Sequence, residues 1–308
     1  ATRSASHAGS WYTGDGRVLG VELSRWLSKV EGTEEHHAGY SYSGAAAAWA
    51  YKSINTSNVK RVFILGPSHH FYLNGCALSM CKTYDTPIGK LPLDTATIQE
   101  LQATDRFTLM TREQDEDEHS IEMHLPYIRK IFEGKDINIV PILVGAISKE
   151  TEAAYGAILA PYLASDDNFF VVSSDFCHWG SRFSYTFYYP NAGSPETAGI
   201  RLSRNNTPSD AFPIYKSISK LDHEAMDILA QPPSTAAQAH VSFEKYLQRT
   251  KNTICGRHPI GVLLGALSKL EADKGISPVL KWVRYEQSSE CQTLQDSSVS
   301  YASAYIRF

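Results

Sequence analysis

Cysteines are few and unpaired in this sequence. Its 308 residues include five scattered cysteines, none of them in a C-x-x-C pair: Cys76, Cys81, Cys177, Cys255 and Cys291. This spacing does not match a structural zinc motif, and the odd number gives no disulfide framework. We therefore expect reduced thiols, as in cytoplasmic or nuclear proteins.

Long apolar runs and basic stretches are also lacking. The longest apolar stretch, 137–147, contains Pro141 and Gly145 and is too short to span a bilayer, and the polar amino terminus has no signal-peptide core. Lysine and arginine are dispersed and the net charge is −4, so no basic surface for nucleic acid is expected. Neither a P-loop nor a G-x-G-x-x-G motif is present. We expect an intracellular protein without membrane insertion, nucleic-acid partner or nucleotide cofactor.

What is present is a globular composition with alternating strand and helix signals. Hydrophobic residues make up 43% and charged residues 20% of the chain, which suits one large α/β domain or two smaller ones. Apolar runs predict strands at 59–65, 76–80, 137–144, 169–172, 279–285 and 299–306. Helical periodicity predicts helices at 18–30, 44–54, 94–103, 117–132 with a bend near Pro126, 149–163, 215–229, 234–247 and after Gly256. We predict a single α/β domain over 1–308 with a central mixed sheet flanked by helices, and a mobile surface loop at 190–212.

Two predicted strands run directly into side chains that can bind metals or move protons. The segment 61–70 reads RVFILGPSHH, and the segment 168–180 reads NFFVVSSDFCHWG. In parallel α/β sheets, ligands bind beyond the carboxyl ends of the strands. The alternative is that Gly-Pro-Ser and Ser-Ser-Asp only form surface turns.

Four short clusters that contain histidine or cysteine compete for a site: 36–40, 66–70, 175–179 and 252–259. Neutral imidazole and thiolate bind iron, copper or zinc, and a carboxylate would complete a facial triad. A mononuclear metal site is one hypothesis. The alternative is that each histidine caps a turn.

A second histidine-rich stretch, EHSIEMH at 118–124, does not match the zinc-protease motif H-E-x-x-H. His119 and His124 are five residues apart, roughly 140° around a helix, so they cannot share a metal on one face. A structural role for His119 and Glu122 is favoured. Three isolated histidines are also expected to be structural: His7, His223 and His240.

A serine or cysteine nucleophile is a further hypothesis. Ser174, Cys177 and Cys255 lie near histidines in the sequence. No G-x-S-x-G motif supports it, and adjacency in sequence does not bring Cys177 and His178 side chains together.

Several blocks, in order along most of the chain, resemble the Memo family, mediators of receptor-tyrosine-kinase-driven cell motility. They are SHAGSWY (6–12), HAGYSYSG (37–44), FILGPSHH (63–70), DEDEHSIEMHLPY (115–127), PILVGA (141–146), VVSSDFCHWG (171–180), NTICGRHPIGVLL (252–264) and QDSSVSYA (295–302). The fold of this family is similar to that of class III extradiol dioxygenases, non-haem iron enzymes that cleave catechol rings. The resemblance therefore implies that architecture for this chain.

The resemblance also implies one mononuclear iron or copper ion bound by His37, His69 and Cys255, with Asp175 and His178 lining the same pocket. His178 matches the acid/base histidine of the dioxygenases, whereas Cys255 replaces their glutamate ligand. A thiolate is softer and more electron-donating than a carboxylate, and it can itself be oxidised. Reduced copper is therefore favoured as well as iron, and catechol cleavage becomes less favoured.

Three functions follow as expectations from this resemblance. The first is metal binding in intracellular redox chemistry and motility signalling, in the cytoplasm or nucleus, with phosphotyrosine peptides as partners. The second is an active oxygenase or oxidase in which His178 is the acid/base, and Asp175 orients it or replaces Cys255 as a ligand. The third is a metal-independent phosphopeptide module. The residues that match the peptide pocket are Trp11, His37, Tyr42, His69, His178 and Cys255; no arginine pair of the usual phosphotyrosine-binding kind accompanies them.

The sequence departs from the family pattern just before His37. Members have an apolar strand and usually a proline there, whereas this chain has EGTEEH at 31–36. Either the strand is deleted, which would loosen the position of His37, or several residues are missing from the sequence. The second interpretation is favoured, because losing a buried strand would remove much of the core.

Overall fold

The structure is a computed structural model that describes residues 1–29, 47, 55–193 and 198–308. Nearly all of the helix predicted at 44–54 lies outside the described residues. The same is true of His37, the first predicted metal ligand, and of Tyr42, a predicted peptide-pocket residue.

A five-stranded mixed sheet forms the centre of the molecule. Its order is β6-β3-β7-β2-β8, in which β3 runs antiparallel to β7 and the other neighbours are parallel. The strands are β2 Arg61–Pro67, β3 Cys76–Ser79, β6 Phe107–Met110, β7 Asn138–Val144 and β8 Asn168–Val172. β2 and β7 are each buried over six consecutive residues, as expected for strands covered on both faces.

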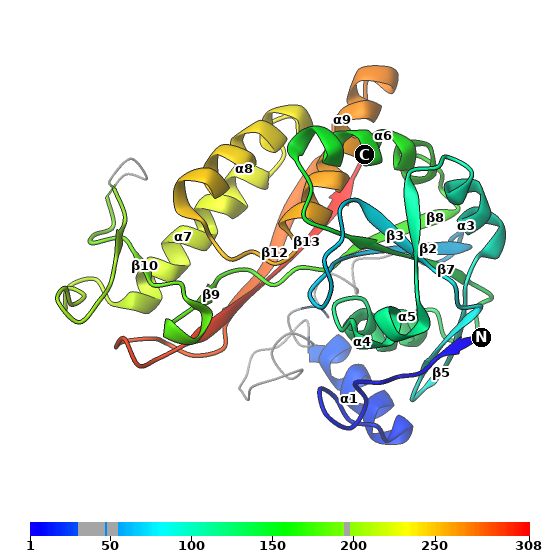
Figure 1. Cartoon of the computed structure of the whole chain (residues 1–308), viewed down its shortest axis with the longest axis horizontal. Coiled ribbons are helices and arrows are strands. Elements are labelled where there is room, and N and C mark those ends of the chain that lie inside the picture. The colour runs from blue at the N-terminus through cyan, green and yellow to red at the C-terminus, as the bar shows by residue number, and fades with distance from the viewer. Residues whose placement is uncertain (30–46, 48–54, 194–197) are drawn as a thin grey trace.

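Helices lie on both sides of this sheet (Figure 1). α6 (Lys149–Leu163) and α9 (Arg257–Lys274) pack on each other and contact β8. On the opposite side lie the helices α1 Gly16–Ser28, α4 Arg112–Asp117 and α5 Leu125–Ile131, and α3 Thr95–Gln102 contacts β6. The predicted α/β fold with a central mixed sheet flanked by helices is confirmed.

Smaller sheets extend this core. One joins β1 Thr2–Arg3, β4 Thr83–Thr86 and β5 Gly89–Pro92; another joins β12 Val279–Gln287, β13 Ser298–Arg307 and β9 His178–Trp179; a third pairs β10 Phe187–Tyr188 with β11 Ile200–Arg201. Beside β12 and β13 lie α7 (Ile214–Leu229) and α8 (Ala236–Thr250), which share a second apolar cluster (Figure 1). β11 lies within the predicted loop 190–212, so part of that loop is hydrogen-bonded to β10. The mobility of the loop stays a prediction.

The prediction of one bent helix at 117–132 is wrong. α4 ends at Asp117, the chain then turns, and a short 3-10 helix, Glu122–His124, leads into α5. The break comes at Glu118 because its carboxylate accepts hydrogen bonds from the backbone N–H groups of His119 and Ser120. Pro126 causes no bend, since it lies in the first turn of α5, where a backbone N–H has no helical partner.

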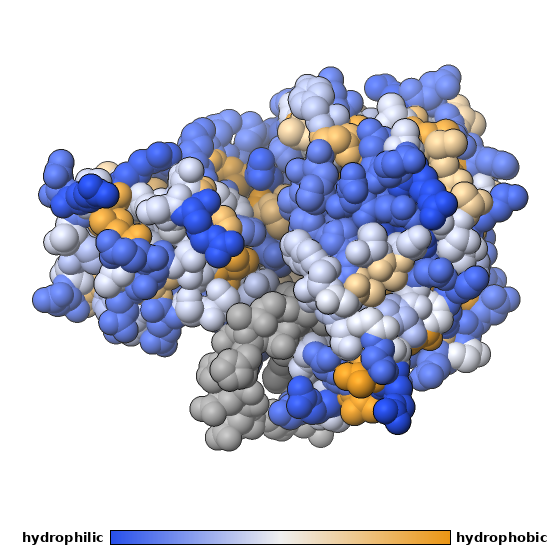
Figure 2. Space-filling view, turned by 60° about the horizontal axis from the view of Figure 1, so that its bottom comes forward, coloured by the Kyte–Doolittle hydropathy of each residue, from blue (hydrophilic) through white to orange (hydrophobic). Residues whose placement is uncertain are grey.

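The surface is mixed in polarity. On the face shown in Figure 2, hydrophobic residues form small separate patches among hydrophilic ones, and no continuous apolar area crosses that face. In the described part of the chain, no helix is both long and apolar enough to cross a membrane.

The close packing of α6 on α9 depends on Gly156. A Cβ atom there would lie 2.4 Å from the backbone nitrogen of Ala266 and 2.6 Å from the carbonyl carbon of Gly265. We expect Gly156→Ala to lower the free energy of unfolding by about 1–3 kcal/mol, because backbone atoms must move apart. Urea denaturation measures this change.

Gly20→Ala in α1 is the matched control for Gly156→Ala. Its Cβ would meet only Ile88 Cγ2, at 4.0 Å. Helix propensity should then raise stability by about 0.5–1 kcal/mol. Equal effects of the two substitutions would contradict the packing argument.

Candidate functional site

The structure places the two predicted strand ends side by side. Leu65 of β2 pairs with Val172 of β8, so the segments that follow leave the same edge of the sheet. Ser120 joins them, because its hydroxyl donates to the carbonyl of Pro67 (3.0 Å) and its carbonyl accepts from Ser173 Oγ (2.9 Å). Three segments distant in sequence therefore meet at this edge.

The Glu118 carboxylate is the centre of this meeting point. Its side chain is 3% exposed. It accepts from His69 Nδ1 and the His69 backbone N–H, both at 2.8 Å, and from the N–H groups of His119 and Ser120 at 3.1 and 3.2 Å. Burial alone would raise the pKa of Glu118, but these hydrogen bonds and the charge of His69 lower it to about 2.

An ionised Glu118 fixes the tautomer of His69. A carboxylate only accepts hydrogen bonds, so the proton of neutral His69 lies on Nδ1 and its Nε2 keeps a free lone pair. His69 lines a cleft of about 1090 Å³ that Asp175 and Cys255 also line. This is the orientation that a metal-binding imidazole with a supporting carboxylate adopts.

Cys255 and Asp175 are joined by two hydrogen bonds to the backbone of Asp175. The Asp175 N–H donates to Cys255 Sγ (3.1 Å), and the Cys255 N–H donates to the Asp175 carbonyl (3.2 Å). Burial, followed by the nearby charge of Asp175, raises the pKa of the Cys255 thiol to about 12. Burial also raises the pKa of Asp175, against the opposing effects of His178 and His69. Both shifts thus disfavour the charged forms of these groups.

His178 is held beside these residues by Thr253. Its Nδ1 lies 2.9 Å from the Phe176 carbonyl and 3.0 Å from the Thr253 carbonyl, so Nδ1 carries the proton and Nε2 is free to accept one. The His178 N–H donates to Thr253 Oγ1 (2.7 Å), which donates to the His178 carbonyl (2.9 Å). His178 is near enough to influence Asp175, but it is not among the residues that line the cleft.

His119 lies between two other rings. It stacks on His69 and on Trp11 with ring centroids 4.4 Å apart in both pairs. Burial, followed by the positive charges of neighbouring histidines, lowers the pKa of His119 to about 4, so this ring is neutral at pH 7.

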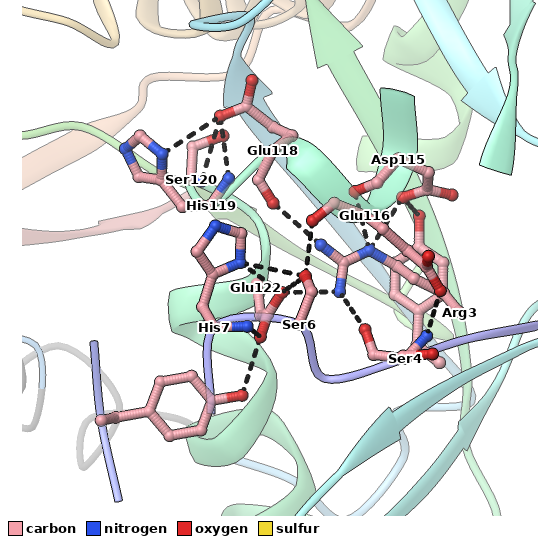
Figure 3. A network of polar contacts seen from close by, with 12 residues as sticks. Arg3, Ser4, Ser6, His7, Asp115, Glu116, Glu118, His119, Ser120 and Glu122 are labelled. Carbon is pink, nitrogen blue, oxygen red and sulfur yellow. Dashed lines mark hydrogen bonds and ion pairs between the residues drawn. The ribbon is translucent and has the colours of Figure 1, made fainter. Parts of the chain in front are cut away.

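The amino-terminal segment is anchored to the segment 115–122 by buried ion pairs (Figure 3). Arg3, 1% exposed, pairs with Asp115 at 3.0 Å and with Glu122 at 2.7 Å. Glu122 also accepts from His7 Nδ1 (2.8 Å) and from the Tyr12 hydroxyl (2.9 Å). The structural role expected for His7 and Glu122 is consistent with these bonds.

The sequence interpretation omitted Glu118 and treated His119 as structural. Ligand atoms of His69, Glu118 and His119 lie within 4.8 Å of one another. These three groups do not make a good ligand set, because Glu118 already accepts four hydrogen bonds. In addition, the rings of His69 and His119 are nearly parallel, 13° apart, so their in-plane lone pairs do not converge. Glu118 therefore supports His69, and His37, His69 and Cys255 remain the predicted ligands.

Comparison with known proteins agrees with the sequence blocks. The family model described as Memo-like protein matches residues 3–305. "Protein MEMO1" of Mus musculus and that of Homo sapiens are each 46% identical to this chain over 313 aligned positions, covering 99% of this chain and 97% of theirs. "Protein memo-1 homolog" of Caenorhabditis elegans is 42% identical and covers 99% of this chain and 82% of that protein. The crystal structure of uncharacterized protein JW3007 from Escherichia coli K12 aligns with a TM-score of 0.46 at 16% identity, covering 91% of both chains.

The tautomer of His69 gives a direct test of the role of Glu118. In the unmodified protein, the ring nitrogens of ¹⁵N-labelled histidine should show the proton of His69 on Nδ1. In Glu118→Gln, an amide nitrogen must face backbone N–H donors whichever way it turns, so we expect loss of that preference and a stability loss of roughly 1–3 kcal/mol.

Glu116→Gln is the matched control for this substitution. The Glu116 side chain is 23% exposed and pairs with Arg112 on the surface. Its loss should leave the His69 tautomer unchanged and cost under about 1 kcal/mol. A wild-type His69 with its proton on Nε2 would show that Glu118 does not set the tautomer.

Proposed function

Because this chain belongs to the Memo-like protein family, we propose that it binds one iron or copper ion through His37, His69 and Cys255. We further propose that it acts in intracellular redox chemistry and in signalling linked to cell motility, in the cytoplasm or nucleus. A bound iron or copper ion would supply one-electron redox chemistry.

The observation that carries this proposal is that His69 and Cys255 line the same cleft, each with a side-chain atom that can bind a metal ion. Glu118 holds the Nδ1 proton of His69 and leaves Nε2 free, and Cys255 Sγ accepts only one backbone N–H, at 3.1 Å. An imidazole nitrogen and a thiolate, formed when the ion displaces the thiol proton, suit iron and copper. The support extends to two of the three proposed ligands, since His37 lies outside the described residues.

An active oxygenase or oxidase is the second candidate function, and His178 favours it. Two backbone carbonyls hold the proton on Nδ1, so Nε2 can take or return a proton without the ring turning. Asp175, with its raised pKa, lies within electrostatic reach of both His178 and His69. In this candidate, His178 is the acid/base and Asp175 orients it or replaces Cys255 as a ligand.

Phosphotyrosine peptides are proposed as partners of the same cleft. Trp11 lines the cleft, is 49% exposed and offers an aromatic surface beside His119. Among the described residues that line the cleft, the one arginine is Arg307. Phosphate recognition would therefore depend on imidazoles rather than on a pair of arginines. For this reason a metal-independent peptide module ranks below the two metal-dependent functions.

Metal analysis tests the ligand assignment. We expect Cys255→Ser to weaken iron and copper binding at least about tenfold, because it replaces a thiolate ligand, whereas Asp175→Asn should stay within about threefold of wild type. Equilibrium dialysis followed by metal analysis measures both. Full binding in Cys255→Ser together with loss in Asp175→Asn would make Asp175 the ligand and our assignment wrong.

Oxygen uptake distinguishes the first candidate function from the second. With catechols as substrates and iron supplied, we expect no sustained turnover, since a thiolate replaces the carboxylate ligand of the dioxygenases. Sustained uptake that falls at least about a hundredfold in His178→Ala would instead establish the oxygenase. His223→Ala, on the exposed face of α7, is the control for loss of a histidine outside the site.

A further inference from the structure

A second cavity lies between α1 and α5, which pack on each other below the central sheet (Figure 1). Its volume is about 480 Å³, which is within the range of small-molecule sites. We call it the α1–α5 cavity. Its lining comes from α1, from the end of α5 and from the turn between β4 and β5, and among the described residues it shares none with the cleft. The proposed function therefore leaves this cavity without a role.

Cations outnumber anions in the lining of the α1–α5 cavity. The charged residues that line it are Arg17, Arg129, Lys130 and Glu133. Glu133 pairs with Lys130 at 3.2 Å, and its side chain is 74% exposed. In the described part of the chain, neither Arg17 nor Arg129 has a carboxylate within ion-pair distance. Two guanidinium groups are thus available to an anion, in a chain whose net charge is −4.

Arg129 is held in place without being neutralised. Its Nη1 donates to the carbonyl of Lys90 (3.0 Å), and its Nη2 donates to the carbonyl of Phe132 (2.8 Å). A guanidinium group has five N–H donors, so three remain for a ligand. Because these two bonds already fix the side chain, an anion that binds Arg129 has little conformational freedom to remove from it.

Two glycines of α1 shape the α1–α5 cavity. A Cβ atom on Gly16 would lie 2.1 Å from the carbonyl oxygen of Pro87, so α1 can pack this closely on the β4–β5 turn only with glycine there. Gly20 lines the cavity without a side chain, opposite Ile88 of the same turn. The helix therefore comes close enough to bring Arg17 to the cavity while leaving room for a ligand.

The lining suits a phosphate monoester better than a carboxylate. A phosphate monoester carries about −1.5 to −2 charge at pH 7 and has three strong acceptor oxygens, whereas a carboxylate carries one charge on two oxygens. Arginine binds phosphate oxygens in pairs through its planar fork. Val21 and Ile88 add apolar surface to the same cavity, which suits a non-polar group esterified to the phosphate.

We propose that the α1–α5 cavity binds a phosphate monoester that carries an apolar group. Arg17 and Arg129 bind the phosphate, and Val21 and Ile88 contact the apolar group. Lys130 adds a third positive charge to the lining. Because this site uses no residue of the cleft, it holds or fails independently of the metal ion proposed there.

Calorimetric titration of the full chain with phenyl phosphate tests this site. We expect Arg17→Gln and Arg129→Gln each to weaken binding at least about tenfold, because each removes charge-assisted hydrogen bonds to the phosphate. Arg25→Gln is the matched control, since Arg25 lies in the last turn of α1 but does not line the cavity. Its affinity should stay within about threefold of wild type. Benzoate, which keeps the ring but has a carboxylate, should bind at least about tenfold more weakly than phenyl phosphate.

Two comparisons decide where the phosphate binds and what it must carry. If Trp11→Ala loses phenyl phosphate while Arg17→Gln binds it as wild type does, the phosphate binds in the cleft and this proposal is wrong. If inorganic phosphate binds within about threefold of phenyl phosphate, the apolar group is not recognised and that part of the proposal is wrong.

The exposed Arg17 keeps the test independent of folding. Arg129→Gln removes two bonds to backbone carbonyls, so this variant counts only if it keeps the wild-type melting temperature. Arg17 is exposed, and Arg17→Gln should keep that temperature. Wild-type affinity in Arg17→Gln, or no binding of phenyl phosphate to the unmodified chain, would overturn the proposal.

Discussion

One buried carboxylate organises the candidate site. Glu118 joins the end of β2 to the segment after α4 by accepting four hydrogen bonds, three of them from backbone N–H groups. Glu118 also ends the helix that the sequence pattern predicts as continuous over 117–132. The interruption of this helix and the orientation of His69 therefore have the same cause. A group buried this deeply and satisfied by four donors is costly to replace, because any neutral substitute leaves backbone donors unpaired.

A second buried carboxylate fixes the segments that carry the other candidate site residues, His178 and Cys255. Asp222, fully buried in α7, accepts from the Cys177 N–H (3.3 Å), from Asn252 Nδ2 (3.1 Å) and from the Tyr285 hydroxyl (2.6 Å). The first two donors belong to the segments that carry His178 and Cys255. The two halves of the site are therefore each fixed by a carboxylate that lies outside the cleft and comes from a different part of the chain.

The sequence allowed the sheet to be predicted better than the site. Strands such as β2 and β8 are short apolar runs bounded by turn residues, so their positions follow from local composition, and the bounds of α6 were predicted correctly. Glu118 was missed because its role depends on His69, 49 residues earlier in the chain, and no local pattern records that contact. Likewise, the stacking of Trp11 on His119 and the ion pair of Arg3 with Glu122 each join residues more than a hundred positions apart. The one local sign of this role was the sequence Glu118-His119-Ser120, in which a carboxylate precedes two backbone N–H groups from which it can accept hydrogen bonds.

The protonation states of Cys255 and Asp175 affect which cation the proposed metal site would bind. Burial raises the pKa of Cys255 to about 12 and also raises that of Asp175, so without a cation the thiol keeps its proton at neutral pH. A cation that uses Sγ must displace this proton, and hard cations such as Mg²⁺, which prefer oxygen, gain little from a thiolate. Ions with strong thiolate affinity are favoured, and a fall in pH should weaken their binding because the proton competes for the same atom. The ionised Glu118 has the opposite effect to the thiol proton, because it favours cation binding. It accepts from His69 Nδ1 and so stabilises a positive charge placed at His69 Nε2. In the proposed metal site, the thiol would therefore set the selectivity for the ion, and the ionised Glu118 would stabilise its positive charge.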